Sequence, residues 1–365
     1  MKQLWYRWRH LLGPARLDMP LMLALLVLIA AGLAVLYSAA SGDMRVVWLQ
    51  AVRIAVGLGA LLVLSRVPPN RLRLLAPWIY LATLSLVLLV PIFGTGRSDR
   101  WLYFGAFYLQ PSELMKLSVP LMVAAFLSDR TLPPRWGALL ISAILIGVPG
   151  VLIMVQPDLG TALLVAASGV FVVFFAGMAW WRIALVGGLT AVAAPIGWHF
   201  LHDYQRRRLL TFMNPEADPL GDGWNIIQSK IAIGSGGMWG KGWGMGTQSR
   251  LEFLPEHTTD FIFSVLAEDF GFVGVCVILG LYLFIIGRCL WISAYARDSF
   301  GRMLGGGLTL TLFVYVLVNG GMISGLLPVV GVPMPLISYG GTSAVTLLSG
   351  FGIILSLHAH RKYRA

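Results

Sequence analysis

Ionisable side chains in or beside apolar runs are the first candidates for chemistry. Glu113 and Lys116 open one apolar run, Asp260 opens another, and Arg53 lies inside a third. Charges at membrane depth are costly, so a functional role is their default interpretation, although Arg53 could instead pair with a carboxylate or extend its head group to the surface. A carboxylate beside a low-dielectric boundary can serve as a general base, which is the role we expect for Asp260.

The acidic residues also have structural explanations, which the sequence leaves open. The i, i+3 spacing places Glu113 and Lys116 on one helical face, where they could form a purely structural ion pair. Asp260 could cap a helix or interact with its dipole. Glu268 and Asp269 follow in the same apolar run, and they could be structural or bind a polar partner.

Residues 203–259 combine positive charge with glycine. Arg206, Arg208 and Lys241 lie in this segment, and the run 234–242 is rich in glycine. Glycine lets backbone N–H groups approach a ligand, and cations attract anions, so the combination suits a phosphate or diphosphate. The spacing matches neither a P-loop nor a Rossmann turn. Taken alone, the glycine run could equally be a flexible loop.

Metal and disulfide chemistry have little support. Cys276 and Cys289 lie in or beside one expected helix, too far apart to bridge, and the sequence has no Cys/His cluster of metal-binding spacing. We expect no obligatory cofactor. A divalent cation such as Mg²⁺ could assist, although no dedicated carboxylate cage is evident.

The elements that position these residues are expected to be membrane helices. The chain of 365 residues is 58% hydrophobic and 12% charged, with a mean hydropathy of +0.79, which excludes an ordinary soluble domain. We predict a single all-α membrane domain over residues 1–365 with about ten spans, since about 20 apolar residues cross the hydrocarbon core. The spans are residues 19–40, 46–65, 76–94, 112–128, 137–155, 160–177, 183–202, 260–287, 303–325 and 341–358.

The distribution of the net charge of +11 predicts the orientation in the membrane. With both termini in the cytoplasm, the inner segments hold about 16 Lys and Arg and the short outer loops about three, as the positive-inside rule requires. This topology explains the positive charge without nucleic-acid binding. It makes residues 203–259 one large periplasmic loop between the seventh and eighth spans, so the polar site faces the periplasm of an inner membrane.

A specific series of polar motifs runs through the chain. The motifs are Gln110-Pro111-Ser112-Glu113, Gln156-Pro157-Asp158-Leu159-Gly160-Thr161, Asp203-Tyr204-Gln205-Arg206, residues 228–237, Gly240-Lys241-Gly242, Gly246-Thr247-Gln248, Phe253-Leu254-Pro255-Glu256, Thr259-Asp260-Phe261-Ile262-Phe263 and residues 333–341. Through them the chain resembles the SEDS (shape, elongation, division and sporulation) family over nearly its whole length. Gln228-Ser229-Lys230 and the short N-terminal tail favour its elongation branch. Relatives commonly have Arg-His or Ala-His where this chain has His257-Thr258, so we expect no essential histidine at position 258.

The resemblance implies a peptidoglycan glycosyltransferase that polymerises lipid II for lateral wall elongation and rod shape. Lipid II is a disaccharide-pentapeptide on undecaprenyl diphosphate. The implied partners are a class B penicillin-binding protein, which crosslinks the strand and activates the polymerase, and other elongation-machinery proteins. The main alternative is a lipid II flippase, and a third possibility is a non-catalytic scaffold.

The expected reaction inverts the anomeric carbon, because an α-linked diphosphate donor becomes a β-1,4 glycan. Asp260 would be the base, and Arg206, Arg208 and Lys241 would stabilise the leaving diphosphate. The lipid tails would lie in grooves between spans. Taken with the resemblance, the predicted substrate-binding residues are Glu113, Lys116, Asp158, Arg206, Arg208, Gln228, Lys241, Gln248, Glu256 and Ser338.

Overall fold

The computed structural model describes most of the chain. The described residues are 17–95, 100–103, 105, 108–185, 187–188, 192, 206, 210–211, 223–247 and 256–361. Two of the predicted site residues, Arg208 and Gln248, lie outside them, as do most of the predicted seventh span and much of the predicted loop 203–259.

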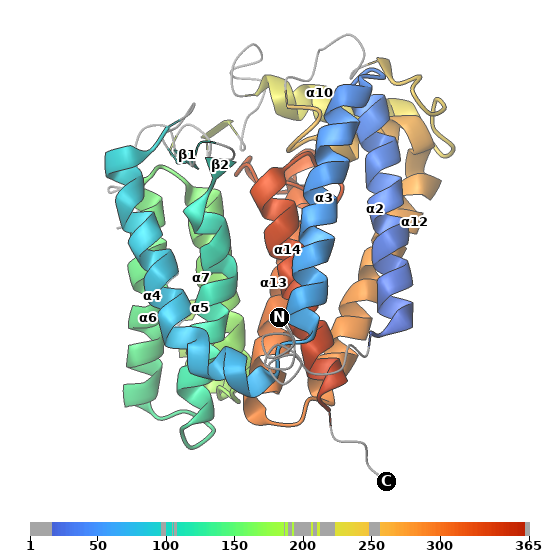
Figure 1. Cartoon of the computed structure of the whole chain (residues 1–365). Coiled ribbons are helices and arrows are strands. Elements are labelled where there is room, and N and C mark those ends of the chain that lie inside the picture. The colour runs from blue at the N-terminus through green and yellow to red at the C-terminus, as the bar shows by residue number, and fades with distance from the viewer. Residues whose placement is uncertain are drawn as a thin grey trace.

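Long helices dominate the described part of the chain (Figure 1). They are α2 (Met19–Ala39), α3 (Met44–Ser65), α4 (Pro69–Phe93), α5 (Pro111–Ser128), α6 (Trp136–Val155), α7 (Leu159–Phe175), α12 (Ile262–Ala294), α13 (Ser299–Ile323) and α14 (Gly341–Ala359). These helices correspond to the predicted spans, apart from the seventh. By length and composition, seven could cross a membrane: α2, α3, α4, α6, α12, α13 and α14. The chain is therefore a polytopic membrane protein.

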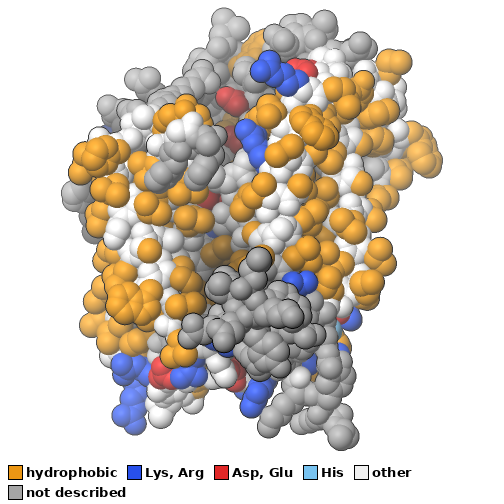
Figure 2. All heavy atoms as spheres, viewed as in Figure 1, with side chains coloured by type: hydrophobic (Ala, Val, Ile, Leu, Met, Phe, Trp, Pro, Cys, Tyr) orange, Lys and Arg blue, Asp and Glu red, His pale blue; other side chains and the backbone are white. Residues whose placement is uncertain are grey.

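The surface of the bundle fits a lipid environment. Figure 2 shows a broad band of hydrophobic side chains on the visible face, with Lys and Arg gathered below it. Many large apolar side chains are exposed along the helices, including Val27, Val63, Trp78 and Leu140. A contiguous apolar surface of this extent would cause a protein in water to associate, whereas lipid chains cover it favourably.

The helices form two groups that meet at α13 and α14. In Figure 1, α4, α5, α6 and α7 lie on one side, and α2, α3 and α12 lie on the other. Helix α13 packs against both α7 and α12, while α14 packs extensively along α3 and also contacts α5. The ends of α5, α7 and α14 thereby converge at one end of the bundle, where the site described below lies.

Local sequence signals set the helix starts that matter for this site. Helix α5 begins with Pro111, whose fixed backbone angle suits the first helical position. Helix α7 begins after Asp158, whose side chain accepts a hydrogen bond from the Thr161 N–H at 3.1 Å. Glu113 lies in the first turn of α5, and Asp158 is itself the N-cap of α7. The signals that start these two helices therefore also position two predicted site residues.

Helix α12 is broken at Gly271, which the sequence did not predict. Gly271 has φ 65° and ψ −165°, and a Cβ there would approach the Gly240 backbone nitrogen at 2.3 Å. Across the break, the Phe272 N–H donates to Gly237 at 2.9 Å and the Val273 N–H donates to Met238 at 3.1 Å. The break therefore lets the glycine-rich loop dock directly on the helix backbone.

Two small elements cover the same end of the bundle. Strands β1 (Leu102–Tyr103) and β2 (Tyr108–Leu109) form an antiparallel pair between α4 and α5. Helix α10 (Trp224–Gly236) belongs to the predicted periplasmic loop 203–259 and packs against α12. Figure 1 shows both at the upper end of the bundle, α10 beside the ends of α2 and α3 and the strands beside the end of α4.

Candidate active site

A polar cavity of about 510 Å³ opens where these elements meet, and we refer to it as the Asp260 cavity. Its walls come from the start of α5, the start of α7, the segment before α12, the loop before α14 and the first turn of α14. Its charged side chains are Arg100, Glu113, Lys116, Asp158, Glu256 and Asp260. Figure 2 shows acidic and basic side chains in the upper middle of the visible face, between hydrophobic side chains on either side.

The segment that carries Asp260 is held from two sides. The fully buried Asn319 of α13 donates to the Asp260 carbonyl oxygen at 2.8 Å and to the Val332 carbonyl oxygen at 2.7 Å. The Ser338 hydroxyl donates to the Thr259 carbonyl oxygen at 2.6 Å. These bonds fix the backbone around Asp260 and leave its carboxylate in the wall of the cavity. The N-cap residue of α12 is Phe261, so the interpretation of Asp260 as an N-cap has no support here.

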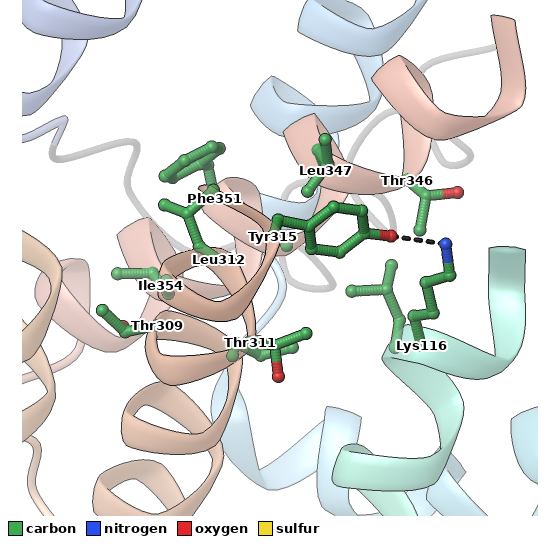
Figure 3. Close-up of a pocket in the computed structure, with 12 residues that line it drawn as sticks. Lys116, Thr309, Thr311, Leu312, Tyr315, Thr346, Leu347, Phe351 and Ile354 are labelled. Atoms are coloured by element: carbon green, nitrogen blue, oxygen red, sulfur yellow. Dashed lines mark hydrogen bonds between the residues drawn. The ribbon is translucent and has the colours of Figure 1, made fainter. Parts of the chain in front are cut away.

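The structure joins Glu113 and Lys116 in a buried ion pair. Lys116 Nζ lies 2.6 Å from Glu113 Oε1, and the two residues are 4% and 5% exposed. Lys116 also donates to the hydroxyl of Tyr315 in α13 (Figure 3). The other carboxylate oxygen, Glu113 Oε2, has no hydrogen-bond partner among the residues described. Since a buried acceptor without a partner is unfavourable, a bound donor group would satisfy it.

Asp158 connects three elements at the rim of the cavity. Besides capping α7, its Oδ2 accepts a hydrogen bond from Gln110 Nε2 at 3.2 Å. Arg100 Nη1 lies 3.5 Å from the same oxygen, and Arg100 Nη2 donates to the Pro157 carbonyl oxygen at 2.5 Å. The charge of Arg100 is thus already engaged within the protein.

A second, mainly apolar cavity lies on the other side of Lys116. It has a volume of about 40 Å³ and lies between α5, α13 and α14. Figure 3 shows Leu312, Leu347 and Phe351 around it, with Lys116 and Tyr315 at one side. Because Lys116 lines both cavities, a polar compartment and an apolar compartment adjoin at this residue. The apolar cavity is too small for a lipid segment, so a ligand would bind in the polar one.

Lys241 lies in a different environment from the one expected for a diphosphate ligand. Its Nζ is 2.6 Å from Glu268 Oε1, and the residue is not among those lining the Asp260 cavity. Asp269, the neighbour of Glu268, accepts hydrogen bonds from the N–H groups of Gly244 at 3.3 Å and Gly246 at 3.1 Å. The buried carboxylates of α12 therefore anchor the glycine-rich loop, and Lys241 contributes to that anchor.

The remaining predicted residues divide by position. Glu256 lines the Asp260 cavity, but Gln228 and Ser338 do not. Gln228 is buried in α10, and the Ser338 hydroxyl forms hydrogen bonds with the backbone of Met334 and Thr259. Arg206 is described but is not among the lining residues. The part of the chain that the structure describes contains no group of three or more His, Cys, Asp or Glu residues suited to a metal ion. An assisting divalent cation stays a prediction.

Sequence reasoning missed Tyr315 and Asn319, although each holds a predicted site residue in place. Both lie in the apolar run of α13 and are almost completely buried. A hydrogen-bonding side chain inside a membrane span was the available signal, because such groups need a partner at that depth.

Comparison with known proteins identifies the family. The family model for FtsW, RodA and SpoVE cell cycle proteins matches residues 16–363, so the chain belongs to this family, the SEDS family. It is 50% identical over 349 residues to the peptidoglycan glycosyltransferase MrdB of Escherichia coli K12, covering 95% of this chain and 94% of that relative. It is 36% identical to stage V sporulation protein E of Bacillus subtilis, covering 77% of each chain.

Two solved structures share the fold. One is a chain from a study of structural coordination of polymerization and crosslinking by a peptidoglycan synthase complex, with a TM-score of 0.83 and 34% identity. The other is the rod shape determining protein RodA of Thermus thermophilus, with a TM-score of 0.72 and 31% identity. Each match covers 96% of this chain and 99% of the other.

Proposed function

We propose that this chain is a peptidoglycan glycosyltransferase that polymerises lipid II at the periplasmic face of the inner membrane. The names of its relatives support the activity. The observation that carries the proposal is the common cavity of Asp260 and the buried Glu113–Lys116 pair, at one end of a membrane bundle.

The shape of the site suits a lipid-linked sugar. A volume of about 510 Å³ lies within the range of small-molecule sites, about 300–1,000 Å³. Sugars and a diphosphate would occupy this polar cavity, and the polyprenyl chain would leave it for the surrounding lipid.

The proposed reaction is a single inverting displacement. Asp260 accepts the proton of the acceptor hydroxyl while that oxygen forms a bond to the anomeric carbon of the donor. The bond from this carbon to the diphosphate breaks, and the diphosphate leaves with the electron pair. General-base catalysis of this kind contributes about 10²- to 10⁴-fold. The donor already carries an activated leaving group, so no nucleotide is required.

The other cavity residues would bind and orient the sugars. Glu113 Oε2 is suited to accept a hydrogen bond from a sugar hydroxyl or an acetamido N–H. Asp158 and Glu256 offer further acceptors at the rim. Arg206 and Arg208 remain proposed contacts of the diphosphate. We leave Lys241 out of this set because its charge is paired with Glu268.

Charge placement supports a periplasmic site. Loops at the end of the bundle opposite the cavity carry Arg66, Arg130, Arg135 and Arg297. Under the positive-inside rule this arginine-rich end is cytoplasmic. The similar chain from a peptidoglycan synthase complex supports a crosslinking partner, which we propose to be a class B penicillin-binding protein.

A flippase is the alternative, but the described charges favour chemistry at one face. A flippase requires a polar path across the membrane. Along α5, no charged residue follows Lys116 until Asp129 beyond its C-terminus. The acidic residues of the cavity are gathered at one end instead.

The test is polymerisation of fluorescent lipid II by the purified protein with its transpeptidase partner. Asp260→Asn should lower glycan formation at least about 100-fold, because base catalysis is lost. Asp43→Asn is the matched control, since Asp43 only caps α3 at the same end of the bundle and asparagine also caps. Normal polymer from a folded Asp260→Asn variant would remove Asp260 as the base, and lipid II translocation without polymer from the wild type would favour the flippase.

A further inference from the structure

Arg53 is a cation of the membrane region that the proposed mechanism does not use. It lies inside α3 and is only partly exposed. Its guanidinium carbon lies 4.6 Å from the centroid of the Tyr339 ring. A ring face attracts a cation, but it carries no net charge to balance one.

Three other described cations that are buried or partly buried each have a carboxylate partner. The pairs are Lys116–Glu113, Lys241–Glu268 and Arg288–Asp18. Within the described ranges, Arg53 forms no ion pair with any carboxylate. A cation in the membrane region without a counter-charge is costly unless an anion arrives from outside the chain.

Arg53 is not itself among the residues lining the Asp260 cavity, but it lies directly behind residues that line it. A Cβ at Gly341 would lie 3.2 Å from Arg53 Nε, so the guanidinium group lies against the first residue of α14. Residues Tyr339 to Ser343 line the cavity. The N-cap residue of α14 is Gly340, which has no side chain to occupy the first N–H groups of the helix. Those N–H groups and the Thr342 and Ser343 hydroxyls add donors beside the cation.

Among the described cations that line or adjoin this corner, Arg53 is the one without a carboxylate partner. Lys116 is paired with Glu113, and Arg100 is engaged by Asp158. The Asp260 and Glu256 carboxylates line the same cavity and supply acceptors rather than cations. An anionic group that enters the cavity is therefore drawn toward the corner that Arg53 and α14 form.

We propose that Arg53, together with the first turn of α14, binds the diphosphate of the lipid-linked substrate. This inference rests on the proposed function, and it specifies where in the cavity the leaving diphosphate binds. The negative charge of the substrate balances Arg53, and the charge that develops on the leaving diphosphate is stabilised there. The diphosphate then lies on the α14 side of the cavity, away from the Lys241 loop.

The test measures binding of three lipids to the purified protein with its transpeptidase partner. The probes are undecaprenyl diphosphate, undecaprenyl phosphate and undecaprenol, which share one tail and differ in charge. The wild type should bind the diphosphate best and undecaprenol least. Arg53→Gln should bind the diphosphate at least about tenfold more weakly with unchanged binding of undecaprenol, and Arg53→Lys should lie between.

Arg45→Gln is the matched control, since it removes the same charge from the exposed outer end of α3 and should bind like the wild type. Equal diphosphate affinity of Arg53→Gln and the wild type would overturn the proposal. If Arg53→Gln instead lowers the melting temperature but leaves the diphosphate affinity unchanged, the proposal is also overturned. Arg53 would then only stabilise the fold through its contact with Tyr339. Loss of the proposed polymerase function would appear separately, as wild-type protein that binds the diphosphate through Arg53 but makes no glycan.

Discussion

Asn319 of α13 donates a hydrogen bond from Nδ2 to the carbonyl oxygen of Asp260 at 2.8 Å. The same amide group donates to the Val332 carbonyl oxygen at 2.7 Å. One fully buried side chain therefore ties the segment that carries the proposed base to the adjacent loop, which also lines the cavity. The position of the Asp260 carboxylate depends on this bridge, although Asn319 itself is not among the residues lining the cavity.

Removal of this bridge should impair the reaction more than the fold. Asn319→Ala frees the Asp260 backbone, and a displacement of about 1 Å at a reacting group can cost about 100-fold in rate. We expect a fall in kcat of about 10- to 100-fold in the lipid II polymerisation assay. Two lost hydrogen bonds should lower the free energy of unfolding by about 1–3 kcal/mol.

Asn70→Ala is the control for this prediction, because Asn70 is exposed at the start of α4 at the opposite end of the bundle. It should retain the wild-type rate. A folded Asn319→Ala protein with an unchanged kcat would show that the bridge does not position the base.

Variants of the buried Glu113–Lys116 pair should show that its contribution to stability can be restored without restoring activity. Lys116→Met leaves the Glu113 carboxylate buried without a cation, which should cost about 3–5 kcal/mol. The double variant Glu113→Gln, Lys116→Met removes both charges, so its thermal stability should return most of the way to that of the wild type.

Activity should not return with stability in this double variant. Glutamine at position 113 offers a neutral carbonyl oxygen in place of the free carboxylate oxygen, so sugar binding should stay weak. Thermal unfolding in detergent and the glycan assay on the same preparations give both quantities. Full recovery of both stability and activity would assign the pair a structural role alone.

The opposite end of the bundle carries a pH-dependent contact. Asp18 precedes α2, and Arg288 Nη2 lies 2.7 Å from its Oδ2. Burial alone would raise the pKa of Asp18, but hydrogen bonds from Arg288 and the Leu21 N–H, with the positive charge of Arg288, hold this pKa below its ordinary value. Because the folded-state pKa is the lower one, the stabilisation is present above the ordinary aspartate pKa of about 3.9 and is lost as pH falls below it.

Asp18→Asn removes this dependence while keeping a side chain that can cap α2. The wild type should unfold at a higher temperature than the variant near neutral pH, and the difference should shrink as pH falls below about 4. A difference in unfolding temperature that stays constant down to pH 3 would contradict the proposed linkage.

The sequence was sufficient to predict most of the membrane helices, because the length and hydropathy of a run decide whether it can span lipid. It also selected Glu113, Lys116 and Asp260, which the structure brings to one cavity, since each is an ionisable group beside an apolar run. In these cases the physical signal is local. The cost of a charge or of an exposed polar backbone in lipid is large enough to be visible in a single segment.

The rest of the site depends on contacts between distant segments. The break in α12 occurs within an apolar run, and Gly271 is one of 42 glycines, so nothing local marks it as the place where the Gly240 backbone docks. The partner of Lys241 is Glu268, in the following helix. From sequence, a lysine in a glycine-rich loop predicts an anion site, and only the packing of that loop on α12 shows that the anion belongs to the protein.

The role of Lys241 can be tested because its two interpretations differ in a double variant. Lys241→Met removes the partner of the fully buried Glu268, so the single variant should lose stability, up to about 3 kcal/mol, together with polymerase activity. If Lys241 anchors the loop, Lys241→Met with Glu268→Gln should recover much of both, because glutamine can still accept the Thr247 N–H bond at 2.8 Å that Glu268 now accepts. If Lys241 instead binds the diphosphate, stability should recover while the KM for lipid II stays raised. Thermal unfolding and steady-state polymerisation of the two single variants and the double variant distinguish these outcomes.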